Sequence, residues 1–232
     1  MDCSKTLDVL GHRNRLEQRF LISFGDDMAD YEFLEFVLTR AIPRRDVKPI
    51  AKELIRRFGT VANVFYAPED KLMEVKWVKK STVILFRIIT ASLKRVCWQT
   101  LSSSKTSVLF NIDVLIDYCR AAIAYAEVEE LHIIYLDAGL KVVGTDLLQK
   151  GTLTSVSIAP REVVRQALEK KAPSIILVHN HPSDNLTPSE KDLRLTEKIA
   201  QACDLMGIKL QEHIIIGKSD YYSFREHYLI NS

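Results

Sequence analysis

The sequence lacks any long hydrophobic run. A membrane-spanning helix needs about 20 consecutive apolar residues, and no such stretch occurs among the 232 residues of the chain. The first residues are polar, so they also lack the apolar segment of a secretory signal peptide. We therefore expect a protein that has no membrane partner and that lies in the cytoplasm.

Charge of one sign and closely spaced cysteines are scarce as well. The chain has 32 Lys and Arg residues against 30 Asp and Glu residues, a net charge of +2. This balance gives no general support for nucleic-acid binding. The four cysteines lack the spacing of a zinc site, and we interpret them as reduced thiols in a cytosol and not as a disulfide framework. They are Cys3, Cys97, Cys119 and Cys203.

The pattern of apolar and polar residues changes near residue 100, which predicts two domains. Residues 1–100 are helical in pattern, and the polar stretch 101–106 suits a linker. Residues 105–232 alternate between strand and helix patterns and form the second predicted domain. Within the first domain we expect helices at 31–38, 47–58, 70–73 and 81–96.

The second part predicts an α/β fold, with a mixed sheet flanked by helices. Two strands, at 131–136 and 141–148, are expected to form a hairpin around the turn Asp137-Ala138-Gly139. Further strands are expected at 152–158, 174–178, 208–210 and 213–216. Helices are expected at 111–127, 160–171 and 188–206.

The strongest chemical pattern begins with His179-Asn180-His181-Pro182, directly after the predicted strand 174–178. Side chains alternate along an extended chain, so His179 and His181 leave the strand on the same side. The stretch Thr187-Pro188-Ser189-Glu190 predicts a helix start, with Thr187 as the N-cap. Ser189 and Asp192 then share one face of that helix.

Two imidazoles and a carboxylate are ligands that zinc accepts, and three protein ligands plus one water make a catalytic zinc site. The pattern therefore predicts metal binding by His179, His181 and Asp192. Each residue also has an ordinary interpretation, because Asp192 suits a helix N-terminus and Ser189 suits a capping position. The pair of histidines beside an apolar strand is what those ordinary roles leave unexplained.

These residues resemble the JAMM signature of the MPN/JAB metalloprotease superfamily, and more closely its RadC branch (the UPF0758 proteins). The stretches 151–152, 160–162, 212–217 and 222–227 also look like RadC landmarks. The resemblance implies an MPN-type mixed sheet and one Zn²⁺ on His179, His181 and Asp192. It further implies that Ser189 polarises the substrate. Asp184-Asn185 stand where relatives commonly have a glycine, but both residue types tolerate left-handed turns.

The resemblance also implies a glutamate that transfers protons, placed well upstream of the histidines. We favour Glu129, which directly precedes the predicted strand at 131–136. Glu130 and Glu162 remain alternatives, although Glu162 also suits the start of a helix. His213 fits either a donor behind a metal ligand or a core histidine, and we favour the core histidine.

In RadC relatives the N-terminal region resembles a helix-hairpin-helix module, whose glycines let a DNA phosphate approach the backbone. Here the corresponding stretch is 75–80, with Trp77 and Lys79 in place of the glycines. The pattern therefore predicts a degraded module with weak support for DNA as a partner.

The leading hypothesis is a RadC-like zinc-dependent hydrolase of the metallopeptidase or isopeptidase type, acting on an unknown peptide or protein. One alternative is a DNA-associated accessory protein, of the DNA repair type, that uses the MPN domain as a binding scaffold. A catalytically silent adaptor is a third hypothesis, which the complete set of three ligands disfavours.

Overall fold

A computed structural model of the chain describes residues 3–151 and 159–230. The chain divides into two compact units, Met1–Ser92 and Leu93–Ser232. The division lies inside helix α6 (Lys80–Ser102), ahead of the polar stretch 101–106 that the sequence marks as a linker. Leu101 is only 3% exposed and joins the core of the second unit, which is why the helix continues to this point.

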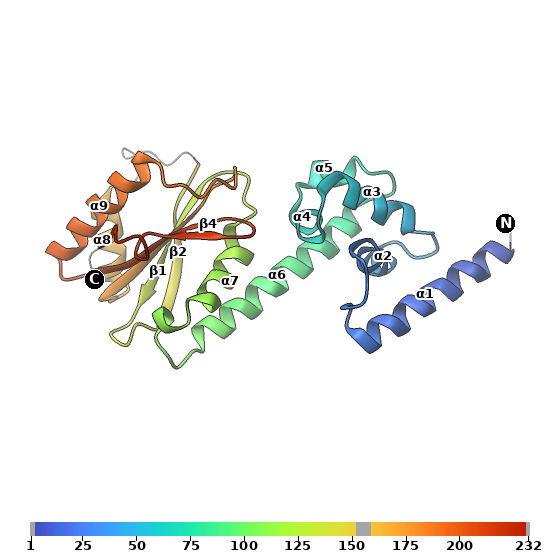
Figure 1. Cartoon of the computed structure of the whole chain (residues 1–232), viewed down its shortest axis with the longest axis horizontal. Helices are drawn as coiled ribbons and strands as arrows, with labels where there is room; N and C mark the ends of the chain where they lie inside the picture. The colour runs from blue at the N-terminus through green and yellow to red at the C-terminus, as the bar shows by residue number, and fades with distance from the viewer. Residues whose placement is uncertain (1–2, 152–158, 231–232) are drawn as a thin grey trace. The chain divides into compact units, whose positions relative to one another are not determined.

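The first unit is built of helices (Figure 1). They are α1 (Cys3–Ser23), α2 (Asp30–Ala41), α3 (Lys48–Phe58), α4 (Val61–Tyr66), α5 (Glu69–Met73) and the first part of α6. The four helices expected from the sequence are confirmed as α2, α3, α5 and α6, and α1 and α4 are two additional ones. The apolar faces of α2 to α6 meet in one core around Leu34, Leu54, Val64 and Phe86.

The turn between α5 and α6 keeps an unusual backbone although it contains no glycine. Trp77 has a φ of 77°, in the left-handed region that glycine adopts without steric cost. The guanidinium carbon of Arg45 lies 3.5 Å from the centroid of the indole ring, and such a cation–π contact is stabilising. The turn thus has a glycine-like backbone at Trp77 but carries a large side chain.

The second unit contains a five-stranded sheet in the order β2-β1-β3-β4-β5. β1 pairs antiparallel with β2 and β3, β3 pairs parallel with β4, and β4 pairs antiparallel with β5. The sheet is therefore mixed, as the sequence predicts. The strands are β1 (Glu130–Leu136), β2 (Val142–Lys150), β3 (Ser174–Asn180), β4 (Lys209–Ile216) and β5 (Tyr221–Ser223).

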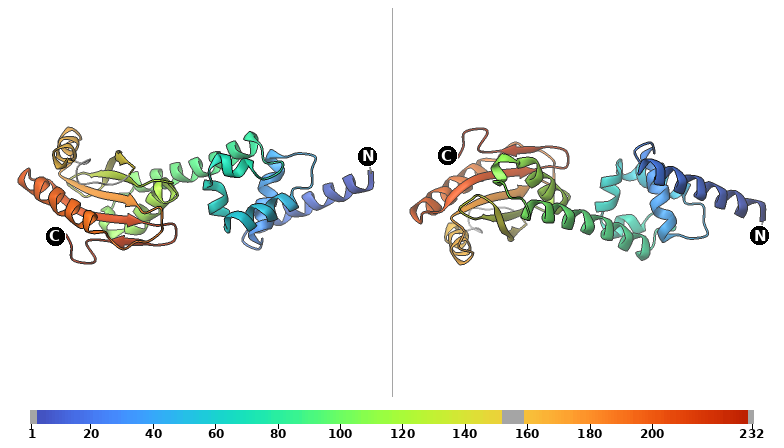
Figure 2. Two further views of the ribbon diagram at one scale, coloured as in Figure 1. Left: turned by 90° about the horizontal axis from the view of Figure 1, so that it is seen from above. Right: turned by 90° about the horizontal axis from the view of Figure 1, so that it is seen from below.

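Helices cover both faces of this sheet (Figure 2). On one face, α8 (Pro160–Glu169) and α9 (Glu190–Leu205) pack on side chains that include Ile175 and Leu177 of β3. On the other face, α7 (Ile112–Ile123) and the end of α6 pack on Ile176 and Val178. All seven residues of β3 are buried, which explains why residues 175–178 form a continuous apolar run and not an alternating pattern.

Three expectations from the sequence differ from the structure. The strands expected at 208–210 and 213–216 are one strand, β4, whose pairing with β3 shifts between Ile175 and Ile176 and leaves Gln211 as the extra residue of a bulge. The helix expected from residue 188 begins at Glu190, because Ser189 and not Thr187 is its N-cap. The helix expected at 111–127 ends at Ile123.

The strand expected at 152–158 lies outside the described residues. Among the residues that are described, no helix combines the length and the apolar character needed to cross a membrane.

Within the second unit, the carboxyl end of β3 and the start of α9 are adjacent, and this is where the histidine pattern lies.

Candidate metal centre

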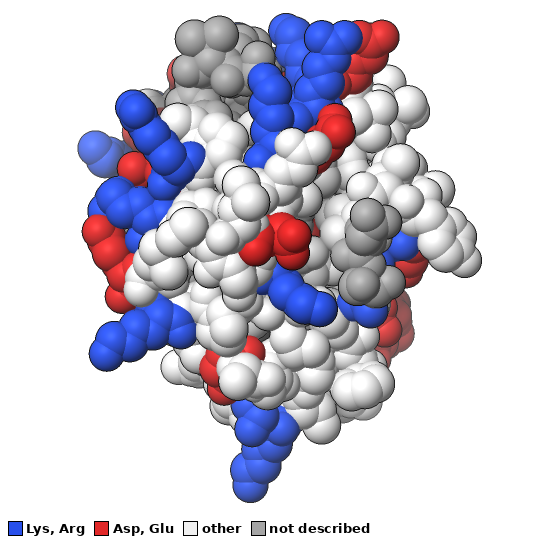
Figure 3. All heavy atoms as spheres, turned by 90° about the vertical axis from the view of Figure 1, so that its left-hand side faces the viewer, with Lys and Arg blue, Asp and Glu red and all other residues white. Residues whose placement is uncertain are grey.

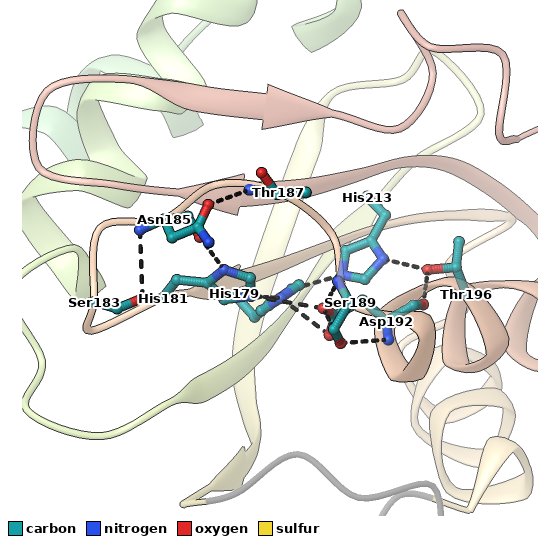
Figure 4. Close-up of polar contacts among 9 residues, drawn as sticks. All are labelled: His179, His181, Ser183, Asn185, Thr187, Ser189, Asp192, Thr196 and His213. Atoms are coloured by element: carbon teal, nitrogen blue, oxygen red, sulfur yellow. Dashed lines mark hydrogen bonds and ion pairs between the residues drawn. The ribbon is translucent and has the colours of Figure 1, made fainter.

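His179, His181 and Asp192 converge at one point, as the sequence predicts (Figure 4). The two Nε2 atoms of the histidines lie 3.0 Å apart. The Asp192 carboxylate lies 3.4 Å from His179 Nε2 and 3.7 Å from His181 Nε2. The alternation of β3 explains the arrangement, because His179 continues the face of Ile175 and Leu177 on which α9 packs.

The hydrogen bonds behind the histidines direct their Nε2 atoms toward this point. His181 Nδ1 lies 2.5 Å from the carbonyl oxygen of Asn185. A carbonyl can only accept, so Nδ1 carries the hydrogen, and a neutral His181 presents a lone pair at Nε2. His179 Nδ1 contacts His213 Nε2 at 2.9 Å, so the Nε2 atom of His179 is the ring nitrogen that faces the cluster. His213 is a fully buried core residue, as expected, but it also contacts a candidate ligand.

The donor set suits a cation. Ligand atoms from the three residues all lie within 4.8 Å of one another, and lone pairs held so close repel unless a positive charge lies among them. Burial lowers the pKa of His179 to about 4, which keeps this imidazole neutral near pH 7 and available as a ligand. Two nitrogens and a carboxylate oxygen form the set that borderline metal ions such as Zn²⁺ accept.

The pKa values of Asp192 and His181 are also shifted from their ordinary values. Burial acts to raise the pKa of Asp192, but the two neighbouring histidines and the hydrogen bonds from the hydroxyl and the backbone N–H of Ser189 outweigh it and hold this pKa well below its usual range. The Asp192 carboxylate in turn raises the pKa of His181. Both shifts reflect an Asp192 carboxylate that stays ionised and attracts positive charge.

Ser189 lies beside Asp192 for a local reason, the capping box that begins α9. The backbone N–H of Asp192 donates to Ser189 Oγ at 3.3 Å, and the backbone N–H of Ser189 donates to Asp192 Oδ2 at 2.7 Å. The Ser189 hydroxyl also donates to Oδ2 at 2.6 Å. The sequence prediction of Thr187 as the cap is wrong, since the reciprocal pair requires a short acceptor three residues before Asp192.

A cleft of about 560 Å³ opens onto the cluster, and Glu129 lines it together with His181, Ser189 and Asp192. Glu130 is directed elsewhere, with contacts of 2.9 Å to Lys150 and 3.2 Å to His132. Of the three candidate glutamates, all within the described chain, Glu129 is therefore the one adjacent to the metal cluster.

Glu162 is also directed away from the cleft. It lies in the first turn of α8, where it pairs with Arg165 and accepts from Gln166 Nε2 at 2.8 Å. Its contacts within α8 are those of a helix-surface carboxylate, the ordinary role that the sequence allows for it.

Asn180 is a contributor that the sequence reasoning missed. Its fully buried side chain leaves the opposite face of β3 from the two histidines. Oδ1 accepts the backbone N–H of Glu130 at 2.8 Å, and Nδ2 donates to the carbonyl oxygens of Val128 at 3.2 Å and Ala126 at 3.3 Å. Asn180 therefore holds the backbone on both sides of Glu129. The only signal in the sequence is an amide residue between the two histidines.

The loop between β3 and α9 makes a left-handed turn at a residue that is not glycine. Asp184 adopts a φ of 61°, as expected for a residue type that tolerates the left-handed region. Its Oδ1 accepts the backbone N–H of Lys218 at 2.8 Å, which ties the loop to the turn after β4. The tie holds the segment that supplies the Asn185 carbonyl oxygen to His181.

Comparison with known proteins agrees with this geometry. The family model described as the RadC-like JAB domain matches residues 109–229. The chain belongs to this RadC-like family. A UPF0758 protein of Ruegeria pomeroyi is 41% identical over 94% of this chain and 96% of its own length. A UPF0758 protein of Fusobacterium nucleatum is 40% identical over 96% of this chain and 98% of its own length.

The RadC-like domain covers all the elements of the candidate site. Its matched range includes Glu129, both histidines, Ser189 and Asp192, and the five-stranded mixed sheet with its flanking helices is consistent with a JAB fold. Within this domain the His-His-Asp cluster is compatible with a metal ion. The similarity extends beyond the domain, since both relatives align over nearly the whole chain.

Proposed function

We propose that this RadC-like protein is a zinc-dependent hydrolase of the metallopeptidase or isopeptidase type. The observation that carries the proposal is the convergence of His179, His181 and Asp192 at one point, beside a cleft that Glu129 lines together with His181 and Asp192. The two Nε2 atoms and the Asp192 carboxylate would hold Zn²⁺, a ligand set of the number and kind found in catalytic zinc sites. When bound, zinc would supply Lewis acidity to a carbonyl oxygen and to a water molecule.

Glu129 would move the proton. Hydrolysis of an amide needs a group that takes a proton from the attacking water and gives one to the leaving amine. Glu129 lines the cleft, and Asn180 holds the backbone on both sides of it, so the point from which its side chain extends is fixed. A braced base loses less freedom when substrate binds, which favours catalysis.

Ser189 would act on the substrate carbonyl and on Asp192. Its hydroxyl donates to Asp192 Oδ2 at 2.6 Å and thereby orients the carboxylate. Rotation about the Cβ–Oγ bond would redirect that hydrogen into the cleft, toward the oxygen of a bound carbonyl on which negative charge develops. The cleft, at about 560 Å³, lies in the size range of substrate-binding sites and suits an extended peptide segment.

The test begins with metal content and ends with turnover. Protein purified without chelator is expected to contain one zinc per chain by elemental analysis, and His181→Ala is expected to lose it. A screen of peptide and isopeptide-linked substrates should then find one that the wild type cleaves. Glu129→Gln should keep its zinc but lose roughly 10²–10⁴-fold in turnover.

The matched control is Glu162→Gln, which changes the same functional group on α8, away from the cleft. It is expected to retain both zinc and turnover. Full activity of Glu129→Gln together with loss of activity in Glu162→Gln would reverse the assignment of the base. Absence of zinc from the wild type, unchanged by His181→Ala, would contradict the proposed function itself.

A further inference from the structure

A buried hydrogen-bond network lies behind the metal cluster and connects two of its three candidate ligands, His179 and Asp192 (Figure 4). His179 Nδ1 lies 2.9 Å from His213 Nε2, and His213 Nδ1 lies 2.6 Å from Thr196 Oγ1. The Thr196 hydroxyl also lies 2.6 Å from the backbone carbonyl oxygen of Asp192. All four residues are at most 4% exposed. The network joins β3, β4 and the first turns of α9.

Only one assignment of donors and acceptors is consistent with this network. The Asp192 carbonyl oxygen can only accept, so the Thr196 hydroxyl donates to it and its oxygen must accept from His213 Nδ1–H. Full burial keeps the His213 ring neutral with a single N–H. His213 Nε2 is then an acceptor, His179 Nδ1 donates to it, and the lone pair of His179 is left on Nε2.

We infer that His213 and Thr196 are positioning residues that hold His179 in the one tautomer able to bind a metal through Nε2. The inference rests on the proposed metal centre and deepens it. A ligand histidine often donates its second N–H to a carboxylate or a backbone carbonyl, which can only accept. Here the acceptor is another imidazole, which can donate or accept, so its own tautomer has to be set by Thr196.

The packing around His213 leaves it few alternatives. Its ring stacks on Phe224 with a centroid separation of 4.5 Å and an interplanar angle of 22°. The stacked face makes no hydrogen bond, and the two nitrogens are directed at His179 and Thr196. Removing the Thr196 hydroxyl would free His213 to carry its hydrogen on Nε2. That hydrogen would point at His179 Nδ1 and drive the His179 hydrogen onto Nε2, the metal-binding atom.

The first test reads the tautomers directly in the intact chain without added metal. Two-bond ¹H–¹⁵N NMR spectra of ¹⁵N-histidine-labelled protein distinguish the protonated from the unprotonated ring nitrogen. In the wild type, His179 and His213 are both expected to carry the hydrogen on Nδ1. In Thr196→Val both should shift to the Nε2–H form, whereas Thr196→Ser should retain the wild-type pattern because the hydroxyl remains.

The second test measures affinity for Zn²⁺ alone, by competition with a chromophoric chelator. Thr196→Val is expected to bind roughly 10–100-fold more weakly than the wild type, the usual cost of losing a partner behind a metal ligand. Thr196→Ser should stay within about twofold of the wild type, since the serine hydroxyl keeps the same hydrogen bonds. Thermal unfolding of each metal-free variant checks that the fold is intact.

Two outcomes would overturn the inference: a wild-type His179 that carries its hydrogen on Nε2, or a folded Thr196→Val that binds Zn²⁺ as tightly as the wild type. A wild type that binds no Zn²⁺ would contradict the proposed function instead. The spectra of the metal-free wild type decide the tautomers in that case too, so the two failures are distinguishable.

Discussion

Asp192 performs several tasks with one residue. Its carboxylate faces both histidines and completes the capping box of α9. Its backbone carbonyl is the last acceptor of the hydrogen-bond network that begins at His179. Ser189 supports the first two tasks through its backbone N–H and its hydroxyl. Changes at Ser189 should therefore affect both the stability of the helix and the binding of a metal.

Ser189→Ala is expected to lower the free energy of unfolding by about 1 kcal/mol, the usual cost of losing an N-cap side chain. It is also expected to weaken zinc binding, because Asp192 loses the hydroxyl that orients it. Urea unfolding and chelator competition measure the two effects. The matched control is Thr60→Ala, which removes the cap of α4 and its bond of 3.1 Å from Asn63 N–H. Equal zinc affinity in Ser189→Ala and Thr60→Ala would contradict the dual role.

Glu212 predicts a pH dependence of stability. Burial raises the pKa of this carboxyl above its ordinary value of 4.5, against the bonds from Ser223 and from the backbone N–H groups of Arg225 and His213. The folded chain therefore retains a proton that the unfolded chain has released, and the free energy of unfolding falls as pH rises from 4.5 through the folded-state pKa.

Glu212→Gln does not ionise, so its stability relative to the wild type should rise with pH across this window. Urea unfolding of both proteins at several pH values from about 4.5 to about 8 gives the difference, in which groups common to both proteins cancel. A difference that stays constant with pH would show that the wild-type carboxyl titrates equally in both states.

Among the elements, the loop between β3 and α9 depends on a distant glycine. A Cβ at Gly217 would lie 2.6 Å from Asp184 Oδ1 and 2.9 Å from Leu186 Cδ2. Both atoms belong to the loop whose Asn185 carbonyl receives the Nδ1–H of His181. The turn after β4 and the loop over the metal cluster are therefore packed too closely to admit a methyl group.

Gly217→Ala should displace this loop and lower zinc affinity by roughly tenfold through His181. The expected loss of stability is about 1–3 kcal/mol, as for an overpacked site. Gly144→Ala is the matched control, because its Cβ would meet only Tyr135 at 3.5 Å, an ordinary contact. Chelator competition and thermal unfolding measure both variants, and identical affinities in the two would contradict the role of the loop.

For the whole molecule, the division into two units gives each its own core. Leu101 is buried against α7 and the sheet of the second unit, with Cys97 and Trp98 packed beside it. The second unit therefore has the apolar core that an independent domain requires.

On the face drawn in Figure 3, basic and acidic side chains are interspersed with uncharged surface, in keeping with a net charge of +2.

A chain of residues 93–232 is expected to fold cooperatively and to bind zinc within about twofold of the full-length affinity. A chain of residues 105–232, cut after the polar stretch, lacks Leu101 and should be less stable by at least about 3 kcal/mol. Urea unfolding of the two fragments compares them. Equal stability would show that the end of α6 contributes nothing to the core.

The sequence alone determined the elements with strong local signals. β3 contains the continuous apolar run 175–178, the β1–β2 hairpin has a turn sequence, and Gly59 caps the end of α3, so their patterns identify them. Local patterns did not separate α4 from its neighbours, resolve the bulge at Gln211, or reveal the short β5. A bulge and an edge strand depend on the partner strand, which lies far away in the sequence.

At the site the same distinction holds. The spacing of His179, His181 and Asp192 was sufficient to predict that they meet, because strand alternation and a helix start are local geometry. Only the tertiary structure brought His213 and Thr196 behind His179, and only the tertiary structure aligned Asn180 with the backbone around Glu129. These contacts join residues 17 to 54 positions apart in the chain. Sheet pairing and helix packing create them, and no local pattern encodes such pairings.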